Sequence, residues 1–231
     1  MEILKCNHLC KNYGEKVVLK DINLSLQSGK IIGLLGKNGT GKSTFIKLIN
    51  DLLTPTSGEI LFNNEKIGIN SKNSISFLPE RTYLNKSMNV KSILKFFSEF
   101  YDNFDCKKAE NLLKDLNIDL NMKLNKMSKG MQEKVQLVLV MSRKAKLYVL
   151  DEPLGGVDPA TRDYILDTIL SNFDEGASVL ISTHLISDIE RILDEVIFIN
   201  DGNIIIHDDC DHLREKENAS IDEIFRRMFK C

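Results

Sequence analysis

The sequence predicts an α/β fold whose core is a parallel sheet covered by helices, with an antiparallel β portion and an inserted helical portion. From Ser128 onward, helical segments and short apolar strands alternate along the chain, as they do in parallel sheets with helical crossovers. Residues 1–30 instead alternate apolar and polar positions around turn signals, which indicates antiparallel strands. Between residues 84 and 126 the spacing of apolar residues becomes helical.

The first part of the chain is expected to form antiparallel strands followed by one buried strand. The stretch KVVLKDINLSLQSGK alternates like a half-buried strand and places Gly29 in a turn. The apolar run IIGLL (31–35) predicts a buried strand, and a helix is expected from Lys42 to about Leu52. After the turn-rich TPTSG, the runs EILF and SISFL predict two further strands.

The middle and last parts of the chain are expected to be mostly helical, with three more buried strands. The stretches NVKSILKFFSEFYDNF and KKAENLLKDL read as amphipathic helices, and packing on a core would suffice to explain their aromatic residues. Strands are expected at 147–150, 178–182 and 195–199. Ser220 and Glu223 have the spacing of a capping box, which predicts a last helix through Phe229.

Composition restricts the class of protein. The 231 residues are enough for one large domain. The formal net charge of −2 provides no basic surface, so no nucleic-acid partner is expected. No apolar run approaches the roughly 18 residues that span a bilayer, and the N-terminal MEILKCNHLCK lacks the pattern of a signal peptide. The chain is therefore expected to be a soluble cytosolic protein.

The cysteines and histidines give little support for a structural metal. The five scattered cysteines are typical of reduced thiols in a cytosol: Cys6, Cys10, Cys106, Cys210 and Cys231. The first two are expected to lie on either side of the end of a short strand. His207, Cys210 and His212 are near one another, but no second ligand cluster at finger-like spacing accompanies them. No structural metal is predicted.

The stretch LLGKNGTGKSTF (34–45) contains the phosphate-binding pattern G-x-x-x-x-G-K-[ST]. Its backbone N–H groups can form an anion nest, and the helix that starts near Lys42 adds its positive end. Lys42 is expected to reach the β- and γ-phosphates of a nucleoside triphosphate, and Ser43 to coordinate Mg²⁺. A glycine-rich turn that binds nothing is the alternative, which the strand–loop–helix order disfavours. The predicted nucleotide-binding residues here are Gly36, Lys37, Asn38, Gly39, Thr40, Gly41, Lys42, Ser43 and Thr44.

Two acids follow the buried strand LYVL (147–150). Open α/β sheets place their chemistry at the carboxyl ends of the strands. Asp151 is therefore predicted to hold Mg²⁺, and Glu152 to polarise an attacking water as a general base. The alternative is a pair of surface acids, which the nearby phosphate-binding loop makes less attractive.

Three further loops carry candidate residues. Ser128 suits a helix N-cap and Gly130 permits close approach of a phosphate, although alone they would be an ordinary helix start. Asp158 lies in the tight loop GGVDP. His184 follows the buried strand in VLISTHL; a lone histidine is more often structural, but beside the strand that carries the two acids it is expected to face the γ-phosphate.

In this order the motifs resemble those of the ATP-binding subunits of ABC transporters, which are P-loop NTPases with a RecA-like core. The resemblance covers nearly the whole chain. The matching positions are Gly36–Thr44 for the Walker A loop, Leu147–Glu152 for Walker B, Met127–Met131 for the signature loop, Gly156–Pro159 for the D-loop, His184 for the switch histidine and Tyr13 for the aromatic residue that stacks on adenine. The resemblance implies one domain: a core with a β subdomain (1–83 and 127–207), a helical subdomain (84–126) and a helical tail (208–231).

Two motifs, the signature loop and the Q-loop, depart from the usual pattern of the family. Lys129 and Met131 replace a glycine and a glutamine of the signature, a form that resembles bacterial subunits whose permease is a separate polypeptide. Glu80 stands where most members have the Q-loop glutamine, and this acid resembles a variant associated with export of peptides and antimicrobials. Glu80 is thus a candidate catalytic residue and Mg²⁺ ligand, because a carboxylate binds a hard cation more strongly than an amide does.

The resemblance implies a cytoplasmic ATPase held at the inner face of the cell membrane through an integral membrane permease. Two such subunits, identical or different, would dimerise head to tail with ATP between the Walker A loop of one and the signature loop of the other, so that Ser128 and Gly130 face the partner's ATP. Asp158 is a further candidate nucleotide-binding residue. A soluble ABC-type ATPase acting on nucleic acid or ribosomes is one alternative, but the chain holds one cassette and no long coiled-coil insertion. A regulatory module without hydrolysis is the other, which Lys42 and Glu152 disfavour.

Overall fold

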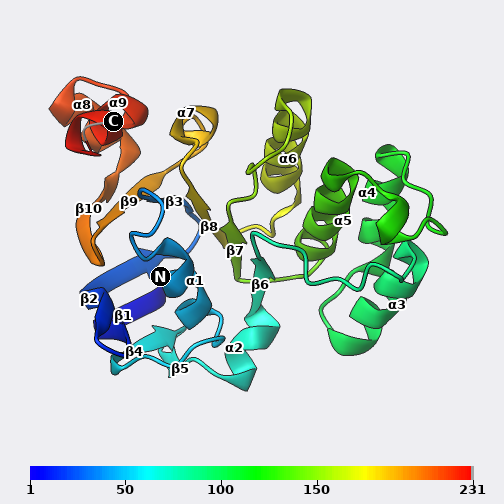
Figure 1. Cartoon of the computed structure of the whole chain (residues 1–231), viewed down its shortest axis with the longest axis horizontal. Helices are drawn as coiled ribbons and strands as arrows, with labels where there is room; N and C mark the ends of the chain where they lie inside the picture. The colour runs from blue at the N-terminus through cyan, green and yellow to red at the C-terminus, as the bar shows by residue number, and fades with distance from the viewer. Residues whose placement is uncertain (230–231) are drawn as a thin grey trace.

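A computed structural model of the chain describes residues 1–229, and Cys231 lies outside the described residues. Its strands form two sheets (Figure 1). A six-stranded sheet has the order β10-β9-β3-β8-β7-β6, and a four-stranded sheet has the order β2-β1-β4-β5. The predicted α/β class with a parallel core is confirmed.

The six-stranded sheet is parallel except at one edge. Its parallel strands are β9 (Glu195–Asn200), β3 (Ile31–Leu35), β8 (Ser178–Thr183), β7 (Leu147–Asp151) and β6 (Ile75–Leu78). Both faces are buried, so alternate residues of β7 enter different cores: Tyr148 and Leu150 one, Leu147 and Val149 the other. The antiparallel edge strand β10 (Asn203–Asp209) was not predicted, because its alternating half-exposed pattern gives a weak signal.

The four-stranded sheet is antiparallel and packs with α1 (Lys42–Ile49) over one face of the parallel sheet. Its strands are β1 (Glu2–Tyr13), β2 (Lys16–Gln27), β4 (Ser57–Phe62) and β5 (Glu65–Lys66). Cys6 and Cys10 both lie inside β1, so the expectation that a short strand ends between them was wrong; pairing with β2 extends β1 to Tyr13. Helix α1 ends before the expected Leu52, and Asp51 adopts a left-handed conformation (φ 54°).

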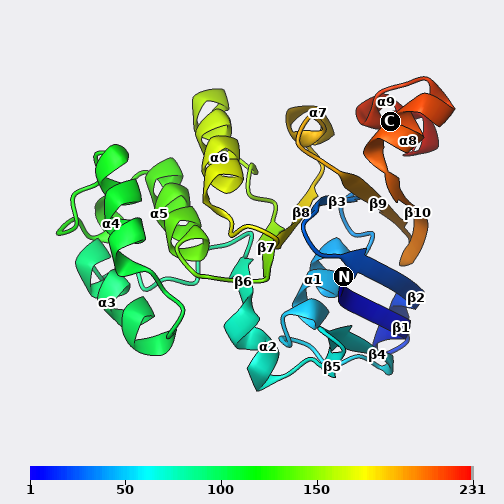
Figure 2. The same cartoon turned by 180° about the vertical axis from the view of Figure 1, so that it is seen from behind.

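Helices cover the opposite face of the parallel sheet. They are α5 (Lys129–Met141), α6 (Pro159–Asn172) and the short α7 (Ile186–Ile189), and the C-terminal pair α8 (Cys210–Glu217) and α9 (Ile221–Phe229) joins the same core. The predicted capping box is confirmed, since Ser220 N donates to Glu223 Oε2 (3.0 Å) and Glu223 N donates to Ser220 Oγ (3.2 Å). The C-terminal pair lies at one end of the molecule in both views (Figures 1 and 2).

Helices α3 (Val90–Phe100) and α4 (Cys106–Asp115) lie at the opposite end and form a third core with α5. Packing on this core explains Phe97, which is 3 % exposed. It does not explain Phe96 and Phe100, which are 51 % and 68 % exposed with their rings stacked 5.7 Å apart. The expectation that core packing accounts for all these aromatic residues was therefore wrong for the outer face of α3.

Arg143 joins the helical end to the core sheet. Its guanidinium donates to the carbonyl oxygens of Lys72 and Ile75 (both 2.9 Å) and lies 3.8 Å over the ring of Tyr101. Lys72 belongs to the short helix α2 (Ile69–Ser74), so the cation also satisfies carbonyl groups at a helix C-terminus. This buried side chain links α2 and β6 to the segment after α3.

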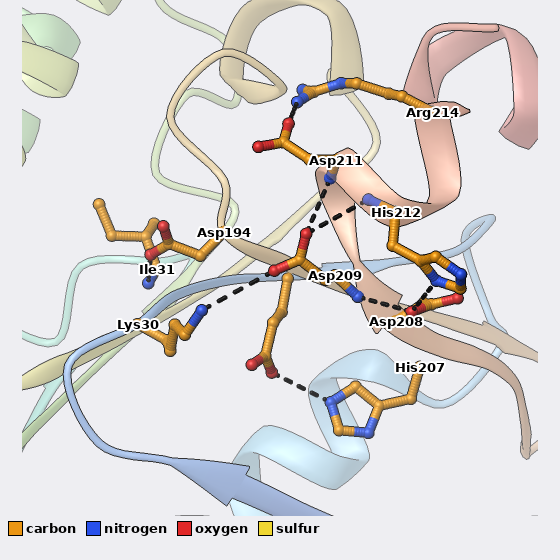
Figure 3. A network of polar contacts seen from close by, with 10 residues as sticks. Lys30, Ile31, Asp194, His207, Asp208, Asp209, Asp211, His212 and Arg214 are labelled. Atoms are coloured by element: carbon orange, nitrogen blue, oxygen red, sulfur yellow. Dashed lines mark hydrogen bonds and ion pairs between the residues drawn. The ribbon is translucent and has the colours of Figure 1, made fainter. Parts of the chain in front are cut away.

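Polar contacts hold the C-terminal pair of helices to the sheet (Figure 3). Asp194 Oδ2 accepts from the backbone N–H of Ile31 (2.7 Å), and the Asp194 carbonyl accepts from Cys210 N (2.8 Å). Asp209 caps α8 by accepting from the backbone of Asp211 (3.0 Å) and lies 3.8 Å from Lys30 Nζ.

The side chains considered as metal ligands have separate partners in this region. His207 Nε2 lies 3.2 Å from Glu195 Oε2, and His212 Nδ1 lies 2.9 Å from Asp208 Oδ1 (Figure 3). Burial raises the pKa of the Cys210 thiol to about 12. Within residues 1–229 no group of three or more His, Cys, Asp or Glu side chains is arranged to hold a metal ion.

A helix that crosses a membrane must be both long and apolar. Among the described residues, no helix is both long enough and apolar enough to do so.

Candidate active site

A cleft of about 1430 Å³ opens beside the carboxyl ends of β3, β7 and β8, between the antiparallel sheet and the start of α5. It brings together residues that are far apart in the sequence. Those of the predicted site that line it are Tyr13, Asn38, Gly39, Gly41, Lys42, Ser43, Thr44, Glu80, Glu152 and His184. Tyr13, at the end of β1, is 47 % exposed on one side of this cleft.

The loop between β3 and α1 requires its glycines. Gly39 and Gly41 have φ of 84° and 114°, a region that side chains with a Cβ rarely adopt. Gly36 has an ordinary φ, but a Cβ there would lie 2.5 Å from the carbonyl oxygen of Ile199 in β9. The loop is held from outside as well, since Gly202 N donates to the carbonyl of Thr40 (3.1 Å). The result is a close-fitting backbone cradle in front of α1.

Lys42 is buried at the floor of the cleft. Its Nζ donates to the carbonyl oxygens of Gly36 (2.6 Å) and Lys37 (3.2 Å) and lies 3.8 Å from Glu152 Oε1. Burial lowers the pKa of Lys42, while the negative charges of Glu152, Asp151 and Glu80 oppose that shift. The ammonium group therefore lies where loop carbonyls and three carboxylates converge.

Asp151 is buried at the end of β7 and bound by hydroxyl groups. Ser182 Oγ donates to its Oδ1 (2.5 Å). Burial raises the pKa of Asp151, the hydrogen bonds from Ser182 and Ser43 lower it, and the nearby charge of Glu80 raises it. Ser43, Glu80 and Asp151 thus form a set of oxygen donors of the kind that Mg²⁺ prefers.

Glu152 follows directly with a left-handed backbone (φ 50°), an uncommon conformation for a residue with a side chain. Its N–H donates to the carbonyl (3.0 Å) and Oγ (3.1 Å) of Ser182. Its Oε2 lies 2.9 Å from Nδ1 of His184, which comes just after β8. This turn directs the Glu152 carboxylate toward both His184 and Lys42.

Ser182 is a site residue that the sequence analysis missed. It contacts both acids from the neighbouring strand, because β8 pairs with β7 in the register Asp151–Ser182. The available signal was a serine at the carboxyl end of a buried strand, two residues before His184. Pairing register, which decides its partner, is not visible in the sequence.

Outside the phosphate-binding loop and the acids after β7, three predicted residues do not line the cleft. Ser128 caps α5 by accepting from Met131 N (3.2 Å), and Asp158 caps α6 by accepting from Thr161 N (3.1 Å) and Thr161 Oγ1 (2.7 Å). The Thr161 hydrogen bonds lower the pKa of Asp158. A Cβ at Gly130 would have no protein atom nearer than 4.0 Å. These positions are open toward the outside of the chain.

The glycine cradle, the buried lysine and the acids at the strand ends define a P-loop nucleoside-triphosphate-binding protein. Residues 19–155 match the family model described as "ABC transporter", which is more than half of the chain. The chain belongs to the ABC transporter family, and within it to the ATP-binding subunits, which bind and hydrolyse ATP for transport.

Known proteins with similar sequences or structures agree with this assignment. The chain is 31% identical over 217 residues to the ABC transporter ATP-binding protein YtrB of Bacillus subtilis, covering 93% of this chain and 74% of YtrB. It is 30% identical over 229 residues to the lantibiotic transport ATP-binding protein SrtF of Streptococcus pyogenes, covering 95% and 97%. A solved ATP-binding subunit of an ABC transporter superposes with a TM-score of 0.89 at 26% identity, covering 98% and 99%.

Proposed function

We propose that this ATPase acts on the cytoplasmic side of the cell membrane as one half of a head-to-tail pair that drives export of a peptide or a related antimicrobial compound through a separate permease. The pairing of two subunits is supported by the division of the predicted site residues between two places on the chain. Lys42, Glu152 and His184 meet in the cleft, whereas Ser128 and Asp158 are exposed and are not among the residues that line it. The kinship with a lantibiotic transport protein and the acid at Glu80 support the substrate class.

ATP is held mainly by backbone and by Lys42 in this proposal. The N–H groups of the loop and the start of α1 face the phosphates, and Lys42 leaves the carbonyls of Gly36 and Lys37 to pair with them. Tyr13 stacks on the adenine at the other end of the cleft. Mg²⁺, held by Ser43, Asp151 and Glu80, would offset the charge of the triphosphate.

Hydrolysis is assigned to Glu152 and His184. Glu152 accepts a proton from the water that attacks the γ-phosphate, and His184 holds the carboxylate through its 2.9 Å contact. Ser182 fixes the turn, because its hydroxyl donates to Asp151 Oδ1 and accepts from the backbone N–H of Glu152. The left-handed turn at Glu152 therefore has a role: it aims the base into the cleft.

The pairing can be tested at Ser128. Because its hydroxyl caps a helix whose positive end faces outward, the partner's γ-phosphate is expected to bind there. Ser128→Arg should abolish ATP-induced dimerisation, measured by size-exclusion chromatography with light scattering, and leave ATP binding by the monomer intact. Ser171→Arg, at an exposed position near the end of α6, is the matched control and should dimerise normally. Full-rate hydrolysis by Ser128→Arg would rule out the head-to-tail site.

The permease is expected to bind beside Glu80 and the outer face of α3. The stacked rings of Phe96 and Phe100 are the large apolar side chains exposed there. Exposed aromatic pairs of this kind are typical of binding surfaces. Nucleotide-dependent changes near Glu80 could in this way reach the membrane subunit.

Glu80→Gln tests the metal role of the acid. Removing its charge lets the pKa of Asp151 fall, because Glu80 raises it. The affinity for ATP should change little, since Lys42 and the loop amides dominate binding. The Mg²⁺ concentration for half-maximal hydrolysis should rise about tenfold, the scale of losses near metal ligands. Binding of Mn²⁺ by the complex with ATP, measured by electron paramagnetic resonance, should weaken by the same factor. Export by vesicles with the permease should fall further than basal hydrolysis. Identical metal curves and undiminished export would mean that Glu80 neither binds the metal nor takes part in coupling to the permease.

A further inference from the structure

A second, much smaller chamber lies behind the cleft, between α5 and the ends of β6 and β7. Its volume is about 20 Å³, close to what one water molecule occupies by this kind of measure. Its polar lining residues are Glu80, Glu133, Gln136, Asp151 and Glu152. The remaining lining residues are Leu78, Pro79, Leu137, Pro153, Gly155 and Ile165. Ser43 does not line it, but the other two proposed Mg²⁺ ligands, Glu80 and Asp151, do, so the chamber adjoins the proposed Mg²⁺ site.

Two buried oxygen atoms on α5 lack a donor at this chamber. Gln136 is only 6 % exposed, and its Oε1 has no hydrogen-bond partner. Glu133 Oε2, one helical turn away, is also buried and without a partner. The other oxygen of Glu133 is accounted for, because Oε1 lies 3.5 Å from Lys129 Nζ. A buried acceptor left unpaired costs about 1–3 kcal/mol, so a donor is expected.

One water molecule meets this requirement better than the other candidates. It has two O–H groups for two acceptors, and the chamber has room for one. Burial raises the pKa of the Glu133 carboxyl, but a proton on it would provide a single donor, whereas a water molecule provides two and also fills the chamber. A metal ion is disfavoured, because within residues 1–229 no three acidic or imidazole side chains are arranged to bind one.

We infer that the chamber is a binding site for one water molecule, which donates to Glu133 Oε2 and Gln136 Oε1 and fills the contact between α5 and the turn that carries Glu152. Glu133 and Gln136 are then positioning residues for Glu152. They act through hydrogen-bond acceptance, and the negative charge of Glu133 is not needed. The positioning role rests on the proposed function of Glu152, whereas the water site does not.

The first test is structural. A high-resolution crystal structure of the full chain should show one density peak within hydrogen-bond distance of Glu133 Oε2 and Gln136 Oε1. Soaking with Rb⁺ should give no anomalous signal at that peak. A dry chamber, or an anomalous peak that marks a cation, would overturn the inference. This result does not depend on hydrolysis: if Glu152→Gln kept full turnover, the proposed function would fail and the water peak would still stand.

The second test uses substitutions in the full chain. Glu133→Leu and Gln136→Leu should each lower kcat about tenfold through misplacement of Glu152, with KM for ATP within about twofold. Glu133→Gln should restore kcat, because its amide oxygen still accepts from the water. The double Leu variant should be no worse than either single one, since the water is already lost. Additive losses, or Glu133→Gln as impaired as Glu133→Leu, would overturn the inference.

A matched control separates this effect from loss of an ordinary ion pair. Lys95 and Glu99 on α3 have the same i,i+4 spacing as Lys129 and Glu133, with Nζ 3.7 Å from Oε1, but they are exposed and border no chamber. Glu99→Leu should leave kcat unchanged. A loss of kcat in Glu99→Leu as large as in Glu133→Leu would mean that pairing on the helix surface, and not the chamber, controls turnover.

Discussion

Glu152→Gln is expected to reduce ATP turnover by roughly 10²–10⁴-fold, the scale of losing a general base. The amide keeps the size of the side chain, so the left-handed turn and the hydrogen bonds from Glu152 N to Ser182 should persist. The contact with His184 and the 3.8 Å approach to Lys42 would lose their charge. ATP affinity should remain, and an ATP-bound dimer should accumulate because hydrolysis no longer opens it.

The measurements are steady-state phosphate release and chromatography with light scattering in the presence of ATP. Glu175→Gln, an exposed acid in the loop before β8, is the matched control and should keep parental turnover. If Glu152→Gln hydrolysed ATP at the parental rate, the general base would have to be another residue. A variant that lost ATP binding would instead show that Glu152 supports the cleft itself.

Lys42→Ala is expected to weaken ATP binding by about 100-fold or more, because charge-assisted hydrogen bonds contribute about 1.5–3 kcal/mol each and Lys42 can make two with the phosphates. The side chain is buried beside the carbonyls of Gly36 and Lys37 and supplies the ammonium group nearest Glu152. Its loss removes the positive charge that interacts with the carboxylates of Glu152, Asp151 and Glu80. Hydrolysis should fall together with binding.

The check is a titration with a fluorescent ATP analogue, which measures affinity without turnover. Lys47→Ala, an exposed lysine on the same helix α1, should bind the analogue as the parent does. Unchanged affinity in Lys42→Ala would contradict the phosphate-binding loop. Lys42→Ala removes side-chain hydrogen bonds to two loop carbonyls but leaves the backbone hydrogen bonds of α1 in place, so the far-ultraviolet circular dichroism of both variants should match the parent.

Much of the core could be predicted because its signals are local. Buried strands such as Ile31–Leu35 and Leu147–Asp151 are continuous apolar runs, and their ends were placed within one residue. The phosphate-binding loop could be read for the same reason: the glycines are required by backbone conformation within nine residues, as φ at Gly39 and Gly41 shows. The capping box at Ser220 could be predicted because its two residues are only three positions apart in the sequence.

Other features could not be read because they depend on contacts between distant segments. The aromatic residues of α3 share one helical pattern, and only packing against α4 and α5 decides that Phe97 is buried while Phe100 is exposed. The length of β1 follows from its pairing with β2, which no local pattern in β1 reveals. His207 and Cys210 look like ligands in sequence, yet β9 gives His207 a carboxylate partner and the core buries Cys210.

The sequence by itself determined which chemical groups this protein has and where the chain must turn to present them: the glycine loop, Lys42, the acids after a buried strand and His184 after another. The tertiary structure alone decided how those groups are aimed. Strand register brings Ser182 against Asp151 and Glu152, and the pairing of β7 with β8 places His184 Nδ1 2.9 Å from Glu152 Oε2. The packing of α5 against the turn at Glu152 creates the chamber at Glu133 and Gln136. Register and packing are set by the free energy of the whole core, so local sequence patterns do not reveal them.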